Sequence, residues 1–461
     1  MTDAQFNRHI TLNAKQKQAY DALMEGKSVF LTGEAGTGKT ALVRKFKRDS
    51  RKRVVVTSTT GTSALLMGGT TLHSYLGIGL GDGCVEWLVE HIKKKRYLAN
   101  RWEKLQVLVI DEISMLNPEL FDKLDAVARA LRNPNKVWGG VQLLLSGDFL
   151  QLPVVKCDKF TFEAECWDDA VDLSVCLTEN VRQAGDETYR GILARLRMGD
   201  VSDEDLNIIN SNIGRDVAVN GIEPTKLYAK NADVDRENED ALDKLAEDAD
   251  AKGETLEFVE FEMSVERVKK VPAWKVDKMK KASIAPDIMQ LCIGAQVMLL
   301  VNRYEAVDGS PPKLVLSNGS RGVVTNIYGD SRVEVKFRDG RVEEIEEHAF
   351  EVNDEKGNVE IILKQIPLRV AYAITIHKSQ GITLDCAEVD LQGCFCEGQA
   401  YVALSRVKSL DGLSLKTACT RSDIQTNTRC VDFYKAKCNL STERTDKQPA
   451  EAPTRTRMRF L

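Results

Sequence analysis

The stretch GEAGTGKT, at residues 33–40, decides the fold of the segment around it. An apolar run at 28–32 precedes it and a helix-like segment at 41–48 follows, which together predict a strand, a glycine-rich loop and a helix. Glycines let successive backbone N–H groups turn toward phosphate oxygens, and the helix N-terminus adds positive charge. We expect Lys39 to reach the β- and γ-phosphates of a nucleoside triphosphate, and the Thr40 hydroxyl to hold Mg²⁺. A glycine-rich turn without function is the alternative, which the flanking elements disfavour.

Length and composition indicate an ordinary globular protein of several domains. The chain has 461 residues, 43% hydrophobic and 29% charged, and a single core stops growing at roughly 250–300 residues. No apolar run approaches the roughly 20 residues that span a bilayer, and the start lacks the apolar core of a secretory signal. The 11 cysteines, an odd number, are typical of reduced thiols. We therefore expect an intracellular protein without a membrane segment.

The charge of the chain neither indicates nor excludes a nucleic-acid partner. The formal net charge is −5, but a local basic groove matters more than the sum. The clearest basic run lies at 93–96, and a solvated helix face is its default interpretation.

Buried-strand patterns continue after the glycine-rich loop at intervals suited to α/β units. Each pattern is β-branched or leucine-rich without alternation, as in a parallel sheet covered on both faces. A helical pattern at 117–131 lies between two of them. We expect a doubly wound α/β domain up to about residue 178. The strand patterns are at 53–57, 107–110 and 141–145.

The second half has a different pattern. A polar, helix-prone segment at 231–251 is followed by short strand signals separated by Asn-Gly, Gly-Asp and Asp-Gly turns. These predict a small antiparallel barrel or meander inserted into a second α/β region, which resumes at 368–415. The tail at 441–461 is rich in Thr, Pro, Arg and Glu, and we expect it to be disordered. The strand signals are at 295–301, 321–328, 332–337 and 359–363.

Two carboxylates, Asp111 and Glu112, follow the predicted strand at 107–110. In a P-loop protein this strand end faces the phosphates. We expect Asp111 to hold Mg²⁺ together with Thr40, and Glu112 to activate the attacking water. Two solvated acids at a turn are the alternative. The P-loop about 70 residues upstream favours hydrolysis.

Three more side chains could complete such a site. Gln151 follows the third strand, where a γ-phosphate sensor could lie. Arg182 and Arg406 could stabilise charge on the γ-phosphate during transfer. By pattern alone each arginine could equally be a surface or structural residue. If both belong to a second domain, the nucleotide would join two domains and its hydrolysis would release them.

The order of these motifs resembles that of superfamily-one helicases, and most nearly the Pif-one family, relatives of RecD and Dda. The resemblance covers about residues 10–435, and 120–140 is similar to a signature of this family. One departure is Leu152-Pro153-Val154, where a second proline is common. The matching segments are 12–16, 33–40, 59–64, 71–75, 111–115, 147–153, 291–302, 318–324, 373–383 and 399–406.

The resemblance implies an α/β fold of two RecA-like P-loop domains. The first would span 1–178, with a short strand-separating wedge inserted at about 77–101. The second would comprise 179–304 and 368–438, with a small β-barrel inserted at 305–367.

The resemblance also implies roles for individual residues. Gln16 would read adenine, so that the nucleotide is ATP, and Arg182 and Arg406 would be the two γ-phosphate arginines of the second domain. Without the family, a satisfied core histidine is the better interpretation of His73 or His377. The loop residues expected to hold the nucleotide with Lys39 are Gly33, Gly36, Thr37, Gly38 and Thr40. The residues expected to line a single-strand track are Thr60, Gly61, His73, Phe149, His377 and Ser379.

The function implied is an ATP- and Mg²⁺-dependent DNA helicase that moves 5′→3′ on single-stranded DNA and unwinds forked duplex as a monomer. By analogy, G-quadruplexes or RNA–DNA hybrids could be substrates, in replication, repair, recombination or telomere maintenance. The alternatives are a P-loop ATPase of another class, a DNA-binding module with an inactive site, and an RNA translocase. The sequence does not decide the compartment or the protein partners.

Overall fold

The glycine-rich loop lies in a six-stranded sheet whose strands all run parallel. The four strands that the sequence predicts here are confirmed. The strand order is β3 (Thr70–Thr71), β2 (Val54–Ser58), β4 (Val107–Asp111), β5 (Gln142–Ser146), β1 (Val29–Gly33) and β6 (Leu173–Leu177). The computed structural model describes residues 11–34, 36–60, 63–64, 67, 69–79, 81–153, 157–179, 185–219, 221–305, 313–316, 318–353, 359–392 and 394–438.

Helices cover both faces of this sheet, which explains why its strands lack polar alternation. In β4, Val107 and Val109 pack in one core with α2 and α3. Leu108 and Ile110 pack in the opposite core with α8. The helices are α2 (Ala14–Met24), α3 (Lys39–Asp49) and α8 (Pro118–Leu131).

The segment predicted as a wedge forms short helices between β3 and β4. They pack beside α8, and Trp102, 1% exposed, anchors them by donating from Nε1 to Leu76 O at 3.0 Å. The basic run at 93–96 is exposed where α6 meets α7, as a solvated face should be. The helices are α5 (Leu72–Leu76), α6 (Val85–Lys94) and α7 (Arg96–Glu103), and the short elements after β4 are η2 (Ile113–Met115), η3 (Val137–Gly140), η4 (Thr161–Glu163) and α9 (Trp167–Ala170).

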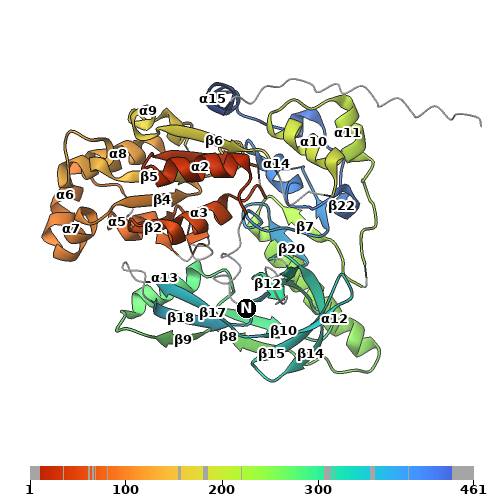
Figure 1. The fold of residues 1–461 in the computed structure, drawn as a ribbon. Helices are drawn as coiled ribbons and strands as arrows, with labels where there is room; N and C mark the ends of the chain where they lie inside the picture. Colours follow the sequence, from red (N-terminus) through yellow and green to blue (C-terminus); the bar gives the residue numbers. More distant parts are fainter. Residues whose placement is uncertain are drawn as a thin grey trace, which may run out of the picture.

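A second parallel sheet of four strands forms the other α/β unit, at the right of Figure 1. Its order is β20 (Ala373–Thr375), β7 (Thr225–Tyr228), β21 (Ala387–Val389) and β22 (Leu413–Leu415). Its helices and short turns are α10 (Glu187–Arg197), α11 (Asp203–Asn210), α12 (Asn231–Ala251), α14 (Gln399–Leu404), η5 (Leu410–Gly412) and η6 (Arg421–Asp423).

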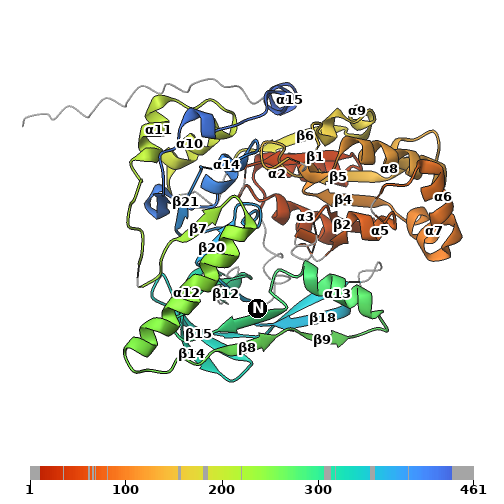
Figure 2. The ribbon, with the colours of Figure 1, turned by 180° about the vertical axis from the view of Figure 1, so that it is seen from behind.

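A β-rich module lies below the two α/β units in Figure 1. It consists of a five-stranded antiparallel sheet, β16-β15-β14-β11-β19, a three-stranded sheet, β17-β18-β9, and the pairs β10-β8 and β12-β13. Figure 2 shows α12 running from the second α/β unit along this module, where Leu242 and Leu245 join its core. The strands are β8 (Val259–Glu262), β9 (Ser264–Arg267), β10 (Ile288–Leu291), β11 (Gln296–Leu299), β12 (Arg303–Glu305), β13 (Lys313–Leu316), β14 (Arg321–Tyr328), β15 (Arg332–Phe337), β16 (Val342–Glu346), β17 (His348–Asn353), β18 (Val359–Gln365) and β19 (Leu368–Val370), and the helix is α13 (Ala273–Ala282).

This module extends beyond the predicted insertion at 305–367. Strands β8 to β11 precede residue 305, yet β11 pairs with β14 and β19, and β9 pairs with β18. Strand pairing between distant segments sets this boundary, whereas the sequence pattern reports only local periodicity.

The last helix, α15 (Thr428–Cys438), returns to the first domain, although the prediction placed it in the second. Its buried residues Cys430, Val431 and Tyr434 belong to the same core as β4 and α8. The predicted disordered tail lies outside the described residues. Within the described ranges, we find no helix whose length and apolarity would let it span a bilayer.

Candidate nucleotide and DNA site

The glycine-rich loop has the geometry of an anion cradle. Gly33, Gly36 and Gly38 have φ values of 142°, 86° and 86°, which side-chain-bearing residues rarely adopt. Helix α3 begins at Lys39 with no side-chain cap, so its first N–H groups are available for a phosphate. Lys39 Nζ donates to Gly33 O at 2.8 Å and to Glu34 O at 3.0 Å.

These residues fit a bound nucleoside triphosphate with Mg²⁺. Burial lowers the pKa of Lys39, and nearby acidic groups oppose that shift. An anion beside its ammonium would compensate the burial. The Thr40 side chain is exposed beside the loop and free to reach a cation.

Gln16 fixes the loop from the outside. Its Nε2 donates to Thr37 O at 3.0 Å, and its Oε1 accepts from Asn13 N in a capping box at the start of α2. A Cβ on Gly38 would lie 2.6 Å from Gln16 Nε2 and would displace this amide, and the φ of 86° at Gly38 independently favours glycine. The amide predicted to read adenine therefore already holds the loop.

The two carboxylates lie at the end of β4 as predicted. Ser63 Oγ donates to Asp111 Oδ2 at 2.7 Å and so orients this carboxylate. Glu112 has a left-handed backbone, with φ of 54°. Burial and neighbouring Asp111 raise the pKa of Glu112 to about 7, while Lys39 and Arg406 oppose the shift. A raised pKa suits a general base near neutral pH.

Gln151 lies at the junction of the two α/β units. Its Nε2 donates to Asp148 Oδ2 at 3.3 Å. Gln380, after β20 of the second unit, donates from Nε2 to Glu112 Oε2 at 3.0 Å and to Gln151 Oε1 at 3.3 Å. The second unit therefore contacts both the expected base and the expected sensor directly.

Arg406 is 1% exposed and lies at the same junction. Its guanidinium donates to Val402 O at 2.9 Å and to Ser405 Oγ at 2.7 Å, within its own unit. Burial lowers its pKa, whereas Tyr401 and Glu112 support its charge. Glu112 of the first unit is thus among the charges that act on Arg406, although the hydrogen bonds of Arg406 stay within the second unit. Arg182 lies outside the described residues.

The residues predicted to line a DNA track divide into two groups. Thr60 and His73 are partly exposed on the first domain. The rings of His377 and Phe395 stack with their centres 6.4 Å apart, and Phe395 is 62% exposed. Burial lowers the pKa of His73, the positive charge of Lys278 in α13 adds to this shift, and Asp82 opposes it.

Two of these residues are buried instead. Phe149 is 2% exposed within an aromatic cluster that includes Phe30 and Trp167. Ser379 is fully buried and its Oγ donates to Ile376 O at 2.7 Å. Both side chains are used inside the fold, so this placement does not support base stacking by Phe149 or a strand contact by the Ser379 hydroxyl. Gly61 lies outside the described residues.

Sequence reasoning missed several residues of this junction. Arg197, at the end of α10, forms a two-point ion pair with Asp148 at 3.0 and 2.8 Å. Gln380 lies in a segment with His377 and Ser379, so its motif was a signal that could have found it. Gly398 packs against the Gln151 backbone. Its only sequence signal is that it directly precedes the segment that forms α14.

Two parallel sheets that meet at a glycine-rich loop, an acidic pair and a buried arginine define a two-domain P-loop nucleotide hydrolase. The sequence profile of PIF1-like helicases matches residues 11–206. The chain is 38% identical to human ATP-dependent DNA helicase PIF1, covering 87% of this chain and 60% of that protein. It is 34% identical to Bdellovibrio bacteriovorus Pif1, covering 92% of each. The chain belongs to the PIF1-like helicase family.

Solved structures agree with this assignment. Bacteroides Pif1 in complex with ADP-AlF4 has a TM-score of 0.74 at 27% identity, covering 93% of this chain and 97% of that one. The same helicase bound to single-stranded DNA scores 0.58 at 28% identity with the same coverage. A structure of two coordinating Pif1 helicases at forked double-stranded DNA scores 0.59 at 29% identity, again over 93% and 97%.

Proposed function

We propose that this protein is an ATP-dependent DNA helicase that translocates 5′→3′ on single-stranded DNA and unwinds forked duplex. Family membership supports the enzyme class. The observation that carries the coupling is the contact of Gln380 with both Glu112 and Gln151. Gln380 of the second unit contacts the expected base and the expected sensor of the first, so the rate of hydrolysis can depend on the relative position of the two units.

The chain's own residues have distinct tasks in this mechanism. Lys39 and the α3 N-terminus bind the phosphates, and Thr40 and Asp111 would hold Mg²⁺, which supplies charge neutralisation when bound. Glu112 takes a proton from the attacking water. Arg406 stabilises charge that develops on the γ-phosphate, and Arg182 is proposed for the same task. Closure of the two units around ATP and their release after hydrolysis would move the strand.

Single-stranded DNA is the proposed track. Thr60, His73 and His377 would contact it without reading sequence, through backbone contacts and ring stacking. The exposed ring of Phe395 beside His377 supports this placement. The 5′→3′ direction, monomeric action, and unwinding of G-quadruplexes or RNA–DNA hybrids in replication, repair, recombination or telomere maintenance are carried over from the resemblance.

The experiment is a comparison of ATP turnover and unwinding on duplexes with a 5′ or a 3′ single-stranded tail. We expect single-stranded DNA to stimulate turnover strongly and only the 5′ tail to support unwinding. Lys39→Ala should abolish both activities, since it removes the phosphate-binding cation. Absence of DNA stimulation at low salt would contradict the proposal, and stronger stimulation by RNA of equal length would favour an RNA translocase.

A further inference from the structure

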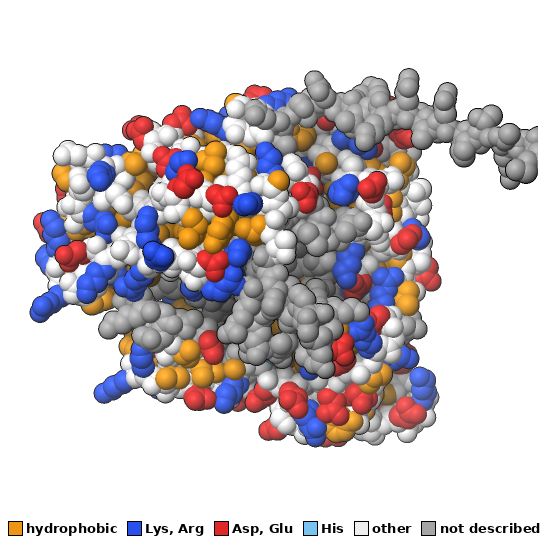
Figure 3. Space-filling view, viewed as in Figure 1, with side chains coloured by type: hydrophobic (Ala, Val, Ile, Leu, Met, Phe, Trp, Pro, Cys, Tyr) orange, Lys and Arg blue, Asp and Glu red, His pale blue; other side chains and the backbone are white. Residues whose placement is uncertain are grey.

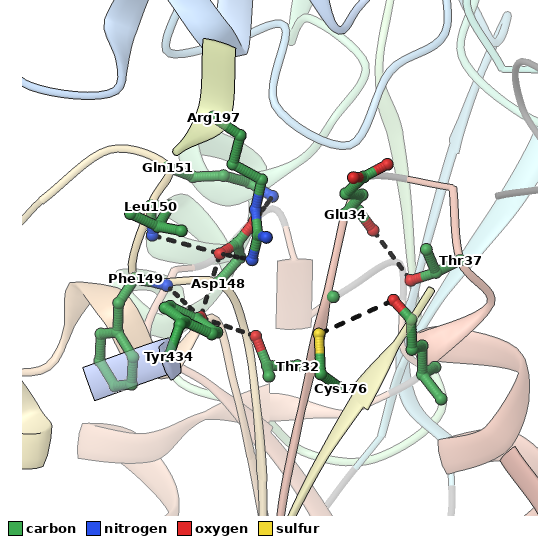
Figure 4. Close-up of polar contacts among 12 residues, drawn as sticks. Thr32, Glu34, Thr37, Asp148, Phe149, Leu150, Gln151, Cys176, Arg197 and Tyr434 are labelled. Carbon is green, nitrogen blue, oxygen red and sulfur yellow. Dashed lines mark hydrogen bonds and ion pairs between the residues drawn. The ribbon is translucent and has the colours of Figure 1, made fainter. Parts of the chain in front are cut away.

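Tyr434 extends from the C-terminal helix α15 into the polar centre of the first domain (Figure 4). Its ring is fully buried. Its hydroxyl contacts three groups: Thr32 Oγ1 at 2.7 Å, Phe149 N at 3.0 Å and Asp148 Oδ1 at 3.0 Å. Thr32 directly precedes Gly33 of the glycine-rich loop, and Asp148 and Phe149 lead to Gln151.

The direction of each hydrogen bond follows from the groups involved. A phenol has one proton and two acceptor sites, and an ionised carboxylate can only accept. The Tyr434 proton therefore goes to Asp148, while Phe149 N–H and the Thr32 hydroxyl donate to the Tyr434 oxygen. Burial, followed by Asp148, raises the pKa of Tyr434 well above its usual value, so the phenol keeps its proton.

Asp148 is the hub of this network. Besides Tyr434, its carboxylate accepts from Arg197 Nε and Nη2, from Gln151 Nε2 at 3.3 Å and from Leu150 N at 3.2 Å. Burial alone would raise the pKa of Asp148, but Arg197, Lys39 and the Leu150 N–H together hold that pKa below its usual value. The Arg197 guanidinium also lies 4.9 Å from the Tyr434 ring centre.

The network joins three parts of the nucleotide site through one side chain. Thr32 belongs to the strand that enters the P-loop, Gln151 is the expected γ-phosphate sensor, and Arg197 belongs to α10 of the second unit. The Tyr434 hydroxyl lies where these three segments converge, within hydrogen-bond distance of Thr32 and Asp148.

We propose that Tyr434 is a positioning residue for ATP hydrolysis, which holds the Asp148–Arg197 pair so that Gln151 keeps its orientation toward the γ-phosphate. This inference rests on the proposed ATP hydrolysis. Through Tyr434, helix α15 would contribute to ATP hydrolysis as well as to the packing of the first domain. Loss of the hydroxyl should loosen Gln151 and slow turnover, while ATP binding at Lys39 and the α3 N-terminus stays intact.

The test is Tyr434→Phe in the full chain, with DNA-stimulated ATP turnover, the KM for ATP and thermal unfolding measured together. We expect kcat to fall about tenfold, as for loss of one buried hydrogen bond to a charged group, with KM almost unchanged. The matched control is Tyr75→Phe, because the buried Tyr75 hydroxyl has no hydrogen-bond partner among the described residues. This control should leave kcat unchanged.

A double-mutant cycle with Gln151→Ala separates positioning from general stability. If Tyr434 acts through Gln151, the loss of kcat in the double variant should be smaller than the product of the two single losses. If the loss of kcat in the double variant equals the product of the two single losses, the inference is overturned. A lower melting temperature of Tyr434→Phe with unchanged kcat would overturn it as well. Should Tyr434→Phe not fold, the Thr32→Val variant provides the test. It removes one hydrogen-bond donor to the Tyr434 oxygen while the side-chain volume stays similar. An unchanged kcat in Thr32→Val would overturn the inference. If the wild-type protein hydrolyses no ATP, the proposed function fails instead.

Discussion

Gly398 shows how one missing Cβ lets the two α/β units meet. This residue directly precedes α14 with φ of 74°, and a Cβ placed on it would lie 2.4 Å from Gln151 O. A backbone carbonyl cannot yield as a flexible side chain can. The glycine therefore permits the close approach of the two units, across which Gln380 contacts Glu112 and Gln151.

Gly398→Ala should disturb the junction through this clash. We expect the free energy of unfolding to fall by about 2 kcal/mol, which lowers the melting temperature. We also expect DNA-stimulated ATP turnover to be slower. Gly340→Ala is the control, because Gly340 has φ of 86° but nothing within 4 Å of a Cβ. It carries the same backbone cost of about 1 kcal/mol without the clash. Equal effects of the two variants would show that the contact with Gln151 is unimportant.

Gln380→Ala should uncouple the second unit from hydrolysis. The variant loses hydrogen bonds to Glu112 and Gln151, and we expect kcat for ATP to fall about tenfold or more, since bonds to charged groups are the stronger ones. The measurement is steady-state turnover with saturating single-stranded DNA. Gln290→Ala, which removes an amide bond to Glu260 on the β-rich module, should leave turnover unchanged. Wild-type turnover by Gln380→Ala would be the contrary result.

At the scale of elements, the local sequence pattern predicted the regular structure well. Strands β1, β2, β4 and β5 and helix α8 were predicted from local patterns, because burial on one or both faces leaves a local signature, and α12 was predicted from its polar, helix-prone composition. Strands β3 and β6 of the same sheet were not predicted. The edges of the β-rich module did not follow, since β9 and β11 pair with strands far along the chain. The sequence therefore predicted element types better than element partners.

The wedge helices α6 and α7 should serve strand separation and not hydrolysis. Lys93, Lys94 and Lys95 are exposed where the helices meet, and Figure 3 shows Lys and Arg side chains over this end of the first domain. Replacing all three by Ala should reduce unwinding of forked duplex severalfold, most clearly at low salt. ATP turnover on single-stranded DNA should stay near the wild-type rate.

The control for this variant is Lys244→Ala with Lys252→Ala, two exposed lysines at α12 and just after it. This pair removes surface charge away from the wedge and should leave unwinding unchanged. Parallel losses of unwinding and ATP turnover in the wedge variant would contradict a specific role at the fork.

At the scale of the whole molecule, the comparisons separate two arrangements of the same family. The chain resembles Bacteroides Pif1 with ADP-AlF4 at a TM-score of 0.74, but its DNA-bound form at 0.58. Identity and coverage are nearly equal in the two comparisons, so neither accounts for the difference in TM-score. The structure described here is thus more similar to the ADP-AlF4 complex than to the DNA-bound form.

Single-stranded DNA should change the overall shape of this protein more than nucleotide alone does. Small-angle X-ray scattering can measure this change, because any rearrangement of the three parts of the molecule alters the distribution of interatomic distances. We expect ADP with aluminium fluoride to leave the profile close to that of the free protein, and an added single strand to shift it. An unchanged profile at saturating DNA would contradict the prediction.

The sequence by itself determined the P-loop, the acidic pair and four strands of the sheet around them, because each depends on a short run of residues with a fixed periodicity or spacing. Only the tertiary structure decided that Phe149 is a core residue, that α15 belongs to the first domain, and that Tyr434 meets Asp148. The last two residues are 286 positions apart. A contact of that range depends on how whole elements pack, and neither segment carries a local sign of its partner.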